Sequence, residues 1–150
     1  MNVIYLTFYG EAEPAGSKQA FVRGGHAHVV DANPRAKGWK ERVAQAAGEQ
    51  YDGPLLQGAL GVSMFFYRPR PVGHFGTGRN AGVLRASAPA YPTTRPDALK
   101  LARGVEDALQ GVLYRDDSQI VMEVLHKRYG EPARCEVVVW EVVAEEGAAA

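Results

Sequence analysis

The stretches TTRPDALKLAR at residues 93–103 and LYRDDSQIV at residues 113–121 contain the clearest structural signals in this chain. The first begins a helix that we predict over about residues 96–109, because its apolar residues recur at spacings of three and four. Gly111 then stands where a glycine commonly ends a helix. The second stretch places Asp116 and Asp117 directly before an alternating run typical of a strand at 119–130. The helix should lie on a sheet through its apolar stripe, formed by Ala98, Leu101, Ala102, Val105, Ala108 and Leu109.

The rest of the chain supplies further strands and one more helix. The predicted elements are strands at 2–10, 58–69 and 133–143, a helix at 35–51, and a hairpin that turns at Gly24–Gly25. Residues 70–96 form a long loop rich in glycine and proline, and residues 144–150 are predicted to be a frayed tail. This order predicts one compact α+β domain over residues 1–150, with a mixed β-sheet and two main helices packed on it.

Composition restricts the classes of protein that the chain can belong to. Its single cysteine, Cys135, excludes an internal disulfide and a cysteine-rich zinc site. No signal peptide or membrane span is recognisable, so a reducing cytoplasm is the simplest compartment. The formal net charge is +0, but residues 68–103 carry seven basic groups and one acid, and residues 104–150 carry four basic groups and ten acids. This separation can create a positive surface for nucleic acid, or it can be an ordinary solvated surface.

The acids of the two opening stretches have both a structural and a chemical interpretation. Asp97 alone would be an acid in the first turn of a helix, and Asp116–Asp117 would be a polar turn before a strand. If residues 112–117 return extended beside the helix, however, the second pair reaches the level of Asp97. Converging carboxylates would then need a divalent cation, and oxygen ligands favour Mg²⁺ or Mn²⁺. With Lys100 and Arg103 near a phosphodiester, this arrangement suits metal-assisted phosphodiester hydrolysis.

The stretch RPDALKLARGVEDALQGVLYRDDSQIV at 95–121 closely resembles the signature of the RusA family of Holliday junction resolvases. That signature runs basic–Pro–Asp–x–Asp–Asn–Leu–x–Lys, then Asp–Ala–Leu, then Asp–Asp–x–Gln–Ile/Val. The segments PAGSKQAF at 14–21 and VLHKRYG at 124–130 also resemble the family. The resemblance implies a homodimeric, Mg²⁺-dependent endodeoxyribonuclease that nicks four-way DNA junctions in recombination and repair. Family members often occur in phages or prophages.

The resemblance also implies roles for individual residues. Asp97 matches the first metal-binding aspartate and Asp117 the later one, with Asp116 beside it, so these three are the predicted metal ligands. Asp97, Asp117 and Arg103 are the predicted catalytic residues. Arg103 occupies the position of the family's lysine, and it keeps a positive charge that can grip a phosphate but cannot donate a proton as a lysine might.

One departure from the family pattern affects the metal site. The family's second aspartate is Leu99 here, and Glu106 is expected to lie too far along the helix, roughly 10 Å, to replace it. The loss of a carboxylate should weaken cation binding or shift ligation to Asp116 or water. The alternative function is therefore a catalytically weakened or inactive protein that binds branched DNA. A third possibility is an assembly or interaction protein without affinity for nucleic acid.

Basic residues outside the acidic sites are candidates for contact with DNA phosphates. Lys18 and Arg79 lie among small, flexible neighbours that would allow close approach. The predicted DNA-binding residues are Lys18, Arg79, Arg95, Lys100 and Lys127. His74 and His126 are weaker candidates for proton transfer, because a lone histidine is more often a surface or packing residue.

Overall fold

A four-stranded mixed sheet forms the centre of the computed structural model, which describes residues 2–16, 18–145 and 147. The strands are β1 (Val3–Tyr9), β6 (Arg134–Glu141), β4 (Leu60–Arg68) and β5 (Ile120–Tyr129), in that spatial order. β6 pairs antiparallel with β1 and β4, whereas β4 and β5 run parallel. The predicted α+β class with a mixed sheet is confirmed.

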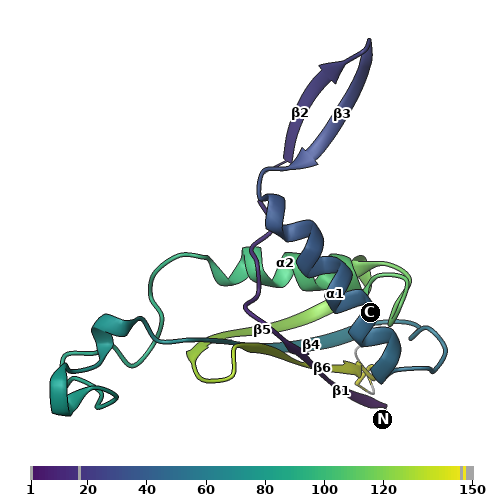
Figure 1. Ribbon diagram of the computed structural model, residues 1–150. Coiled ribbons are helices and arrows are strands. Elements are labelled where there is room, and N and C mark those ends of the chain that lie inside the picture. The colour runs from purple at the N-terminus through teal and green to yellow at the C-terminus, as the bar shows by residue number, and fades with distance from the viewer. Residues whose placement is uncertain (1, 17, 146, 148–150) are drawn as a thin grey trace.

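Two helices, α1 (Pro34–Gln50) and α2 (Ala98–Leu109), cover one face of this sheet (Figure 1). The predicted stripe of α2 does face the core, since Leu101 and Val105 are fully buried. α1 buries Trp39 and Val43 against the same layer. The helix-facing strand residues complete the core, and they include Leu6, Phe8, Leu60, Val62, Met64, Phe66, Cys135, Val137 and Val139.

In the described part of the chain, the opposite face of the sheet has no helix on it (Figure 1). We call it the free face; it is made by residues 3, 5, 7 and 9 of β1, 134, 136, 138 and 140 of β6, 61, 63, 65 and 67 of β4, and 122, 124, 126 and 128 of β5. On this face the indole of Trp140 lies over Gly61, so closely that an added Cβ at Gly61 would overlap the ring. Glycine is therefore required at this position by packing.

A second, two-stranded sheet projects from the body as a hairpin (Figure 1). Its strands are β2 (Lys18–Arg23) and β3 (His26–Asp31), and they turn at Gly24 and Gly25, whose φ values are +58° and +77°. Glycine adopts this left-handed conformation without steric cost, which explains the predicted turn. Every strand residue except Asp31 is exposed, so the hairpin packs on the body only at its base.

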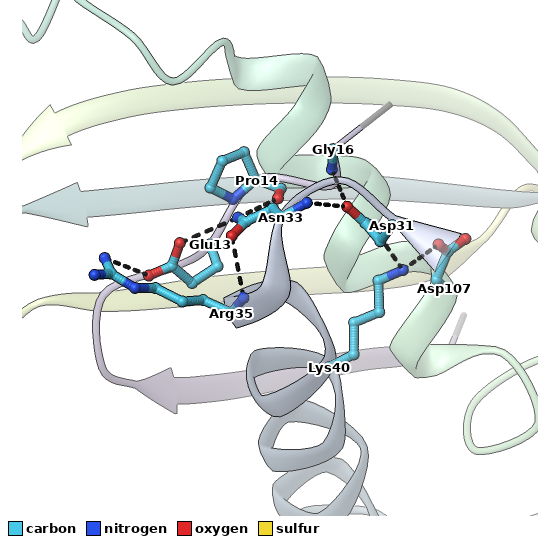
Figure 2. Close-up of polar contacts among 8 residues, drawn as sticks. All are labelled: Glu13, Pro14, Gly16, Asp31, Asn33, Arg35, Lys40 and Asp107. Atoms are coloured by element: carbon cyan, nitrogen blue, oxygen red, sulfur yellow. Dashed lines mark hydrogen bonds and ion pairs between the residues drawn. The ribbon is translucent and has the colours of Figure 1, made fainter. Parts of the chain in front are cut away.

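Asp31 organises that base (Figure 2). Its Oδ1 accepts hydrogen bonds from the backbone N–H groups of Gly16 at 2.7 Å and Asn33 at 2.9 Å. Lys40 of α1 lies 3.9 Å from Asp31 Oδ2 and donates to Asp107 Oδ2 of α2 at 3.0 Å. One ammonium thus connects the hairpin with both helices.

The structure corrects three details of the sequence-based prediction. α2 begins at Ala98, and Asp97 is the N-cap residue, although its side chain makes no capping hydrogen bond. The segment after Gly111 is not extended: Val112 and Leu113 donate to Leu109 O, and residues 111–114 form a tight turn. The loop at 70–96 contains two short 3₁₀ turns, Val72–His74 and Gly78–Asn80. The predicted frayed tail falls partly on residues 146 and 148–150, outside the described residues.

Two other sequence-based expectations can be compared with the fold. Gly111 has a φ of +84° directly after the last residue of the helix cap, as predicted. Within the described residues, no helix has both the length and the apolar character needed to cross a membrane.

Gly61→Ala should lower the free energy of unfolding by about 1–3 kcal/mol, because the added methyl overlaps the Trp140 ring and the indole must move. Gly48→Ala is the matched control: it lies inside α1 with open space around it, and it should raise stability by about 0.5–1 kcal/mol. Urea denaturation of both variants measures the difference. Equal behaviour of the two variants would contradict the packing at Gly61.

Candidate active site

A pocket of about 320 Å³ brings together four carboxylates from three parts of the chain. We call it the acidic pocket. Its lining residues are Leu99, Ala102, Arg103, Glu106, Asp107, Asp117 and Glu123. Asp117 and Arg103, both predicted from the sequence as catalytic residues, therefore share one pocket.

Helix periodicity and strand alternation explain why these side chains meet. Leu99, Arg103 and Glu106 follow one another at spacings of four and three, so they lie on the same side of α2. Glu123 pairs with the buried Val62 in the parallel ladder, which places its side chain on the helix side of β5. The polar edge of the helix thus faces the polar start of the strand.

Asp117, which lines this pocket, begins a short 3₁₀ turn, Asp117–Gln119, directly before β5. Asp116 caps the turn: its Oδ1 accepts from Ser118 N at 2.8 Å, while Gln119 Oε1 accepts from Asp116 N at 3.1 Å. Hydrogen bonding with Ser118 also holds the pKa of the Asp116 carboxyl below its usual value. Asp116 does not line the acidic pocket, so its predicted role as a metal ligand stays a prediction.

Glu106 has the most perturbed carboxyl in the pocket. Burial, a side-chain hydrogen bond with Glu123, and repulsion from Glu123, Asp117 and Asp107 together raise its pKa from about 4.5 to about 8. Near neutral pH, Glu106 therefore keeps a proton that it shares in a hydrogen bond with Glu123. Such crowding of acids around one carboxyl is typical of sites that take a cation.

Asp97 lies elsewhere, in a second pocket of about 390 Å³ that we call the basic pocket. Its lining residues are Glu11, Glu13, Pro14, Arg35, Arg68, Arg95, Pro96, Asp97 and Lys100. Asp97 and Asp117, which were predicted to converge, therefore line different pockets. Leu99, two residues after Asp97, lines the pocket of Asp117 and not that of Asp97.

Lys127 fixes the segment that carries Asp97. Its Nζ donates to Thr94 O at 2.9 Å and to Pro96 O at 3.0 Å. Lys127 is half-buried on the helix side of β5, opposite Phe66. The structure thus gives this residue a positioning role at the start of α2, while its predicted contact with DNA stays untested.

The other predicted DNA-binding residues lie on three parts of the surface. Lys18 is exposed on the hairpin, Arg79 is exposed in the 70–96 loop, and Arg95 and Lys100 line the basic pocket. Neither of the two candidate histidines lines the acidic pocket. The ring of His74 packs edge-on against Tyr129, and that of His126 stacks on Phe65 with centroids 4.4 Å apart.

The donor set of the acidic pocket suits a hard divalent cation. Asp117, Glu106 and Glu123 offer only oxygen atoms, which Mg²⁺ and Mn²⁺ prefer. In the described part of the chain, no three acidic, histidine or cysteine side chains already form a group that could hold an ion, so the pocket is an open cleft rather than a closed cage. Side-chain rotation about the fixed α2 and β5 backbones would have to complete the coordination.

The sequence-based prediction rejected Glu106 as too distant and did not include Glu123. The expected distance of roughly 10 Å separates Glu106 from Leu99 along the helix axis, but Asp117 and Glu123 lie beside Glu106 and not beside Asp97. The spacing of Leu99, Arg103 and Glu106 was a signal that all three face one way. The inward position of Glu123 would have required knowledge of the strand register.

Comparison with known proteins places these features in a family context. The model of the family described as "Endodeoxyribonuclease RusA" matches residues 11–140. The "Uncharacterized protein YqaN" of Bacillus subtilis (strain 168) is 33% identical to this chain over 149 residues. That alignment covers 96% of this chain and 100% of the relative. Both pockets and the hairpin lie within the matched residues.

Glu106→Gln should flatten the dependence of stability on pH in the presence of EDTA. Because the folded-state pKa of Glu106 is raised to about 8, its contribution to stability is fully present below about pH 4.5 and is lost as pH rises through 8. The glutamine amide does not titrate, so the variant should not lose this stability as the pH rises. Urea denaturation between pH 5 and 9 measures the free energy of unfolding of both proteins. Glu49→Gln, on α1 outside the acidic pocket, should keep the wild-type profile. If Glu106→Gln kept the wild-type dependence of stability on pH, the raised pKa of Glu106 would be contradicted.

Proposed function

Because the chain belongs to the RusA family of endodeoxyribonucleases, we propose that it is a Mg²⁺-dependent nuclease that cuts branched DNA, four-way junctions in particular. The observation that supports this proposal most strongly is the acidic pocket, where Arg103 stands beside Asp117, Glu106 and Glu123. Carboxylates and a guanidinium in one cleft are parts that phosphodiester hydrolysis can use.

In this proposal Asp117, Glu106 and Glu123 hold the metal ion through their carboxylate oxygens. A divalent ion bound there would activate water as a nucleophile and neutralise charge on the phosphate. Arg103 donates hydrogen bonds to the non-bridging phosphate oxygens, and it does not act as a proton donor, because a guanidinium stays charged. Glu106 must lose its shared proton before its carboxylate can face a cation, so cation binding should release a proton.

Asp97 keeps its proposed catalytic and metal-binding role on the basis of its position in the family signature. In the structure its carboxylate is free of any capping bond, and it lines a pocket with Arg35, Arg68, Arg95 and Lys100. We propose that this basic pocket receives the phosphates next to the cleaved bond, since arginine and lysine side chains bind phosphate through charge-assisted hydrogen bonds. Asp97 would then lie between the DNA phosphates bound in the basic pocket and the metal ion bound in the acidic pocket.

The second candidate function is binding of branched DNA without efficient cleavage. The observation that favours it is Leu99, which is 68% exposed in the acidic pocket at the place of the family's second aspartate. An exposed leucine on a helix contributes little to the core, so packing does not explain it. The two functions differ in whether Glu106 and Glu123 compensate for the missing carboxylate.

Asp117→Asn and Glu106→Gln should each lower the rate of junction cleavage by roughly 100-fold or more, because each removes a charged oxygen donor from the metal site. Asp97→Asn should do the same, as the family signature implies. Cleavage of a labelled four-way junction with Mg²⁺, against a matched duplex and an EDTA control, measures the effect. Binding of the junction should persist in all three variants.

Asp52→Asn is the control for these variants, since Asp52 is exposed and lines neither pocket. It should cleave at the wild-type rate. Wild-type cleavage by Asp117→Asn would remove the acidic pocket from the reaction, whereas wild-type cleavage by Asp97→Asn alone would leave only the acidic pocket.

Leu99→Asp separates the two candidate functions. If the wild type is an active nuclease, this variant should lower the Mg²⁺ concentration that gives half-maximal cleavage, because a further carboxylate joins the site. Leu99→Asn is the matched control of similar size without the charge. A nearly inactive wild type that gains roughly 100-fold in rate from Leu99→Asp would instead support the DNA-binding function.

A further inference from the structure

The two sides of the projecting hairpin differ in chemistry (Figure 1). Directly paired residues of antiparallel strands share one side of the ribbon, and successive residues along a strand alternate between the sides. One side, which we call the aromatic face, therefore holds the pairs Gln19–Val30, Phe21–His28 and Arg23–His26. Beyond the base pair Lys18–Asp31, the other side holds small apolar residues: Ala20, Val22, Ala27 and Val29.

A pair of stacked rings stands in the middle of the aromatic face. The rings of Phe21 and His28 stack with their centroids 5.3 Å apart and their planes 18° apart. Phe21 is nevertheless 44% exposed, and every residue from 18 to 30 is exposed. Because the stack does not reach the core of the protein, its outer surface is available to a ligand that can stack on an aromatic ring.

The charge of the hairpin indicates what kind of ligand this is. Residues 18–30 contain a lysine, an arginine, two histidines and no acid, although the whole chain has a formal net charge of +0. Arg23 and His26 flank the Gly24–Gly25 turn and follow the ring stack as the next pair on the same side. An exposed aromatic platform beside cationic side chains is the arrangement that binds nucleic acid whose bases are accessible.

The base of the hairpin is bonded to residues of both pockets (Figure 2). Asn33 Nδ2 donates to Pro14 O at 2.9 Å and to Glu13 Oε2 at 3.3 Å, and these two acceptor residues line the basic pocket. Lys40, which also contacts the hairpin base, donates to Asp107 of the acidic pocket at 3.0 Å. DNA that occupied the two pockets would therefore pass the foot of the hairpin.

We infer that the aromatic face of the hairpin recognises the branch point of the DNA. This inference rests on the proposed function, which makes branched DNA the substrate. Phe21 stacks on a base that has lost a stacking neighbour at the branch, and Arg23 binds a phosphate beside that base. Phe21 lies three residues along β2 from Lys18 at the hairpin base, about 10 Å in an extended strand, which keeps its ring near DNA bound at the pockets.

Stacking by Phe21 would distinguish branched from regular DNA in a way that phosphate contacts alone do not. In a regular duplex each base is covered by its neighbours on both sides, so a protein ring finds a free base only where strands branch or are unpaired. Contacts from arginine and lysine to phosphates form on either kind of DNA. The aromatic face is thus assigned the selectivity, and the two pockets the general affinity.

Phe21→Ala tests the inference, with Val22→Ala as the matched control. Val22 is the next residue of the same strand, 74% exposed on the other side of the hairpin. Fluorescence anisotropy in EDTA measures the affinity for a labelled four-way junction and for a matched duplex without metal-dependent cleavage. Phe21→Ala should bind the junction roughly 5- to 100-fold more weakly than the wild type and bind the duplex equally well. Val22→Ala should match the wild type on both.

Two further variants separate stacking from the loss of an apolar side chain. Phe21→Leu keeps apolar volume without an aromatic ring and should bind like Phe21→Ala, whereas Phe21→Trp should keep the wild-type preference for the junction. The indole introduced by Phe21→Trp should be quenched by the junction and not by the duplex, after subtraction of the signal of the chain's own two tryptophans. Circular dichroism should show the wild-type fold in every variant, since the hairpin lies outside the core.

Wild-type affinity of Phe21→Ala or Phe21→Leu for the junction would overturn the inference, as would an equal loss on junction and duplex. A wild type that binds neither DNA in EDTA overturns it as well. A loss in Val22→Ala would move recognition to the apolar side of the hairpin.

Cleavage of the same junction with Mg²⁺ is measured separately, so that the two proposals fail in different ways. If the wild type cuts junctions while Phe21→Ala binds them normally, the proposed function stands and the inference falls. If junction binding depends on Phe21 but the wild type cuts nothing, the nuclease is refuted and the inference stands.

Discussion

The parallel pairing of β4 and β5 is the constraint on which the rest of the structure depends. Parallel neighbours must be joined by a connection that crosses back along the sheet. Here the chain leaves β4 at Arg68, passes through the 70–96 loop, and returns as α2 before β5 begins at Ile120. The returning helix must therefore lie beside β5. Its polar edge then faces the start of that strand, which is how one helix, one short turn and one strand come to share a cluster of acids.

The fold could be predicted further than the site. The stripe of α2, the glycine turn of the hairpin and the glycine after the helix all follow from local rules, and each is present. The site was predicted only in part because its geometry depends on residues 111–114, which form a tight turn rather than an extended segment. That turn is set by tertiary contacts: Tyr114 is buried and its hydroxyl donates to Glu106 O at 2.8 Å. The spacing of apolar residues in the sequence does not predict such a contact.

Polar residues with two possible roles were the hardest to assign. Asp116 and Asp117 are adjacent and chemically identical, yet one caps a turn and the other faces a pocket. Lys127 is a basic residue, which is why the sequence suggested a DNA contact. In the structure its Nζ donates hydrogen bonds to two backbone carbonyls.

The attachment of the hairpin has an evolutionary consequence. In the described residues, all strand positions except Asp31 are exposed, and Asp31 connects the base of the hairpin to the body through Gly16, Asn33 and Lys40. Substitutions between Lys18 and Val30 therefore escape the packing constraints that hold the core residues constant. This segment can therefore change in sequence at little cost to the free energy of folding.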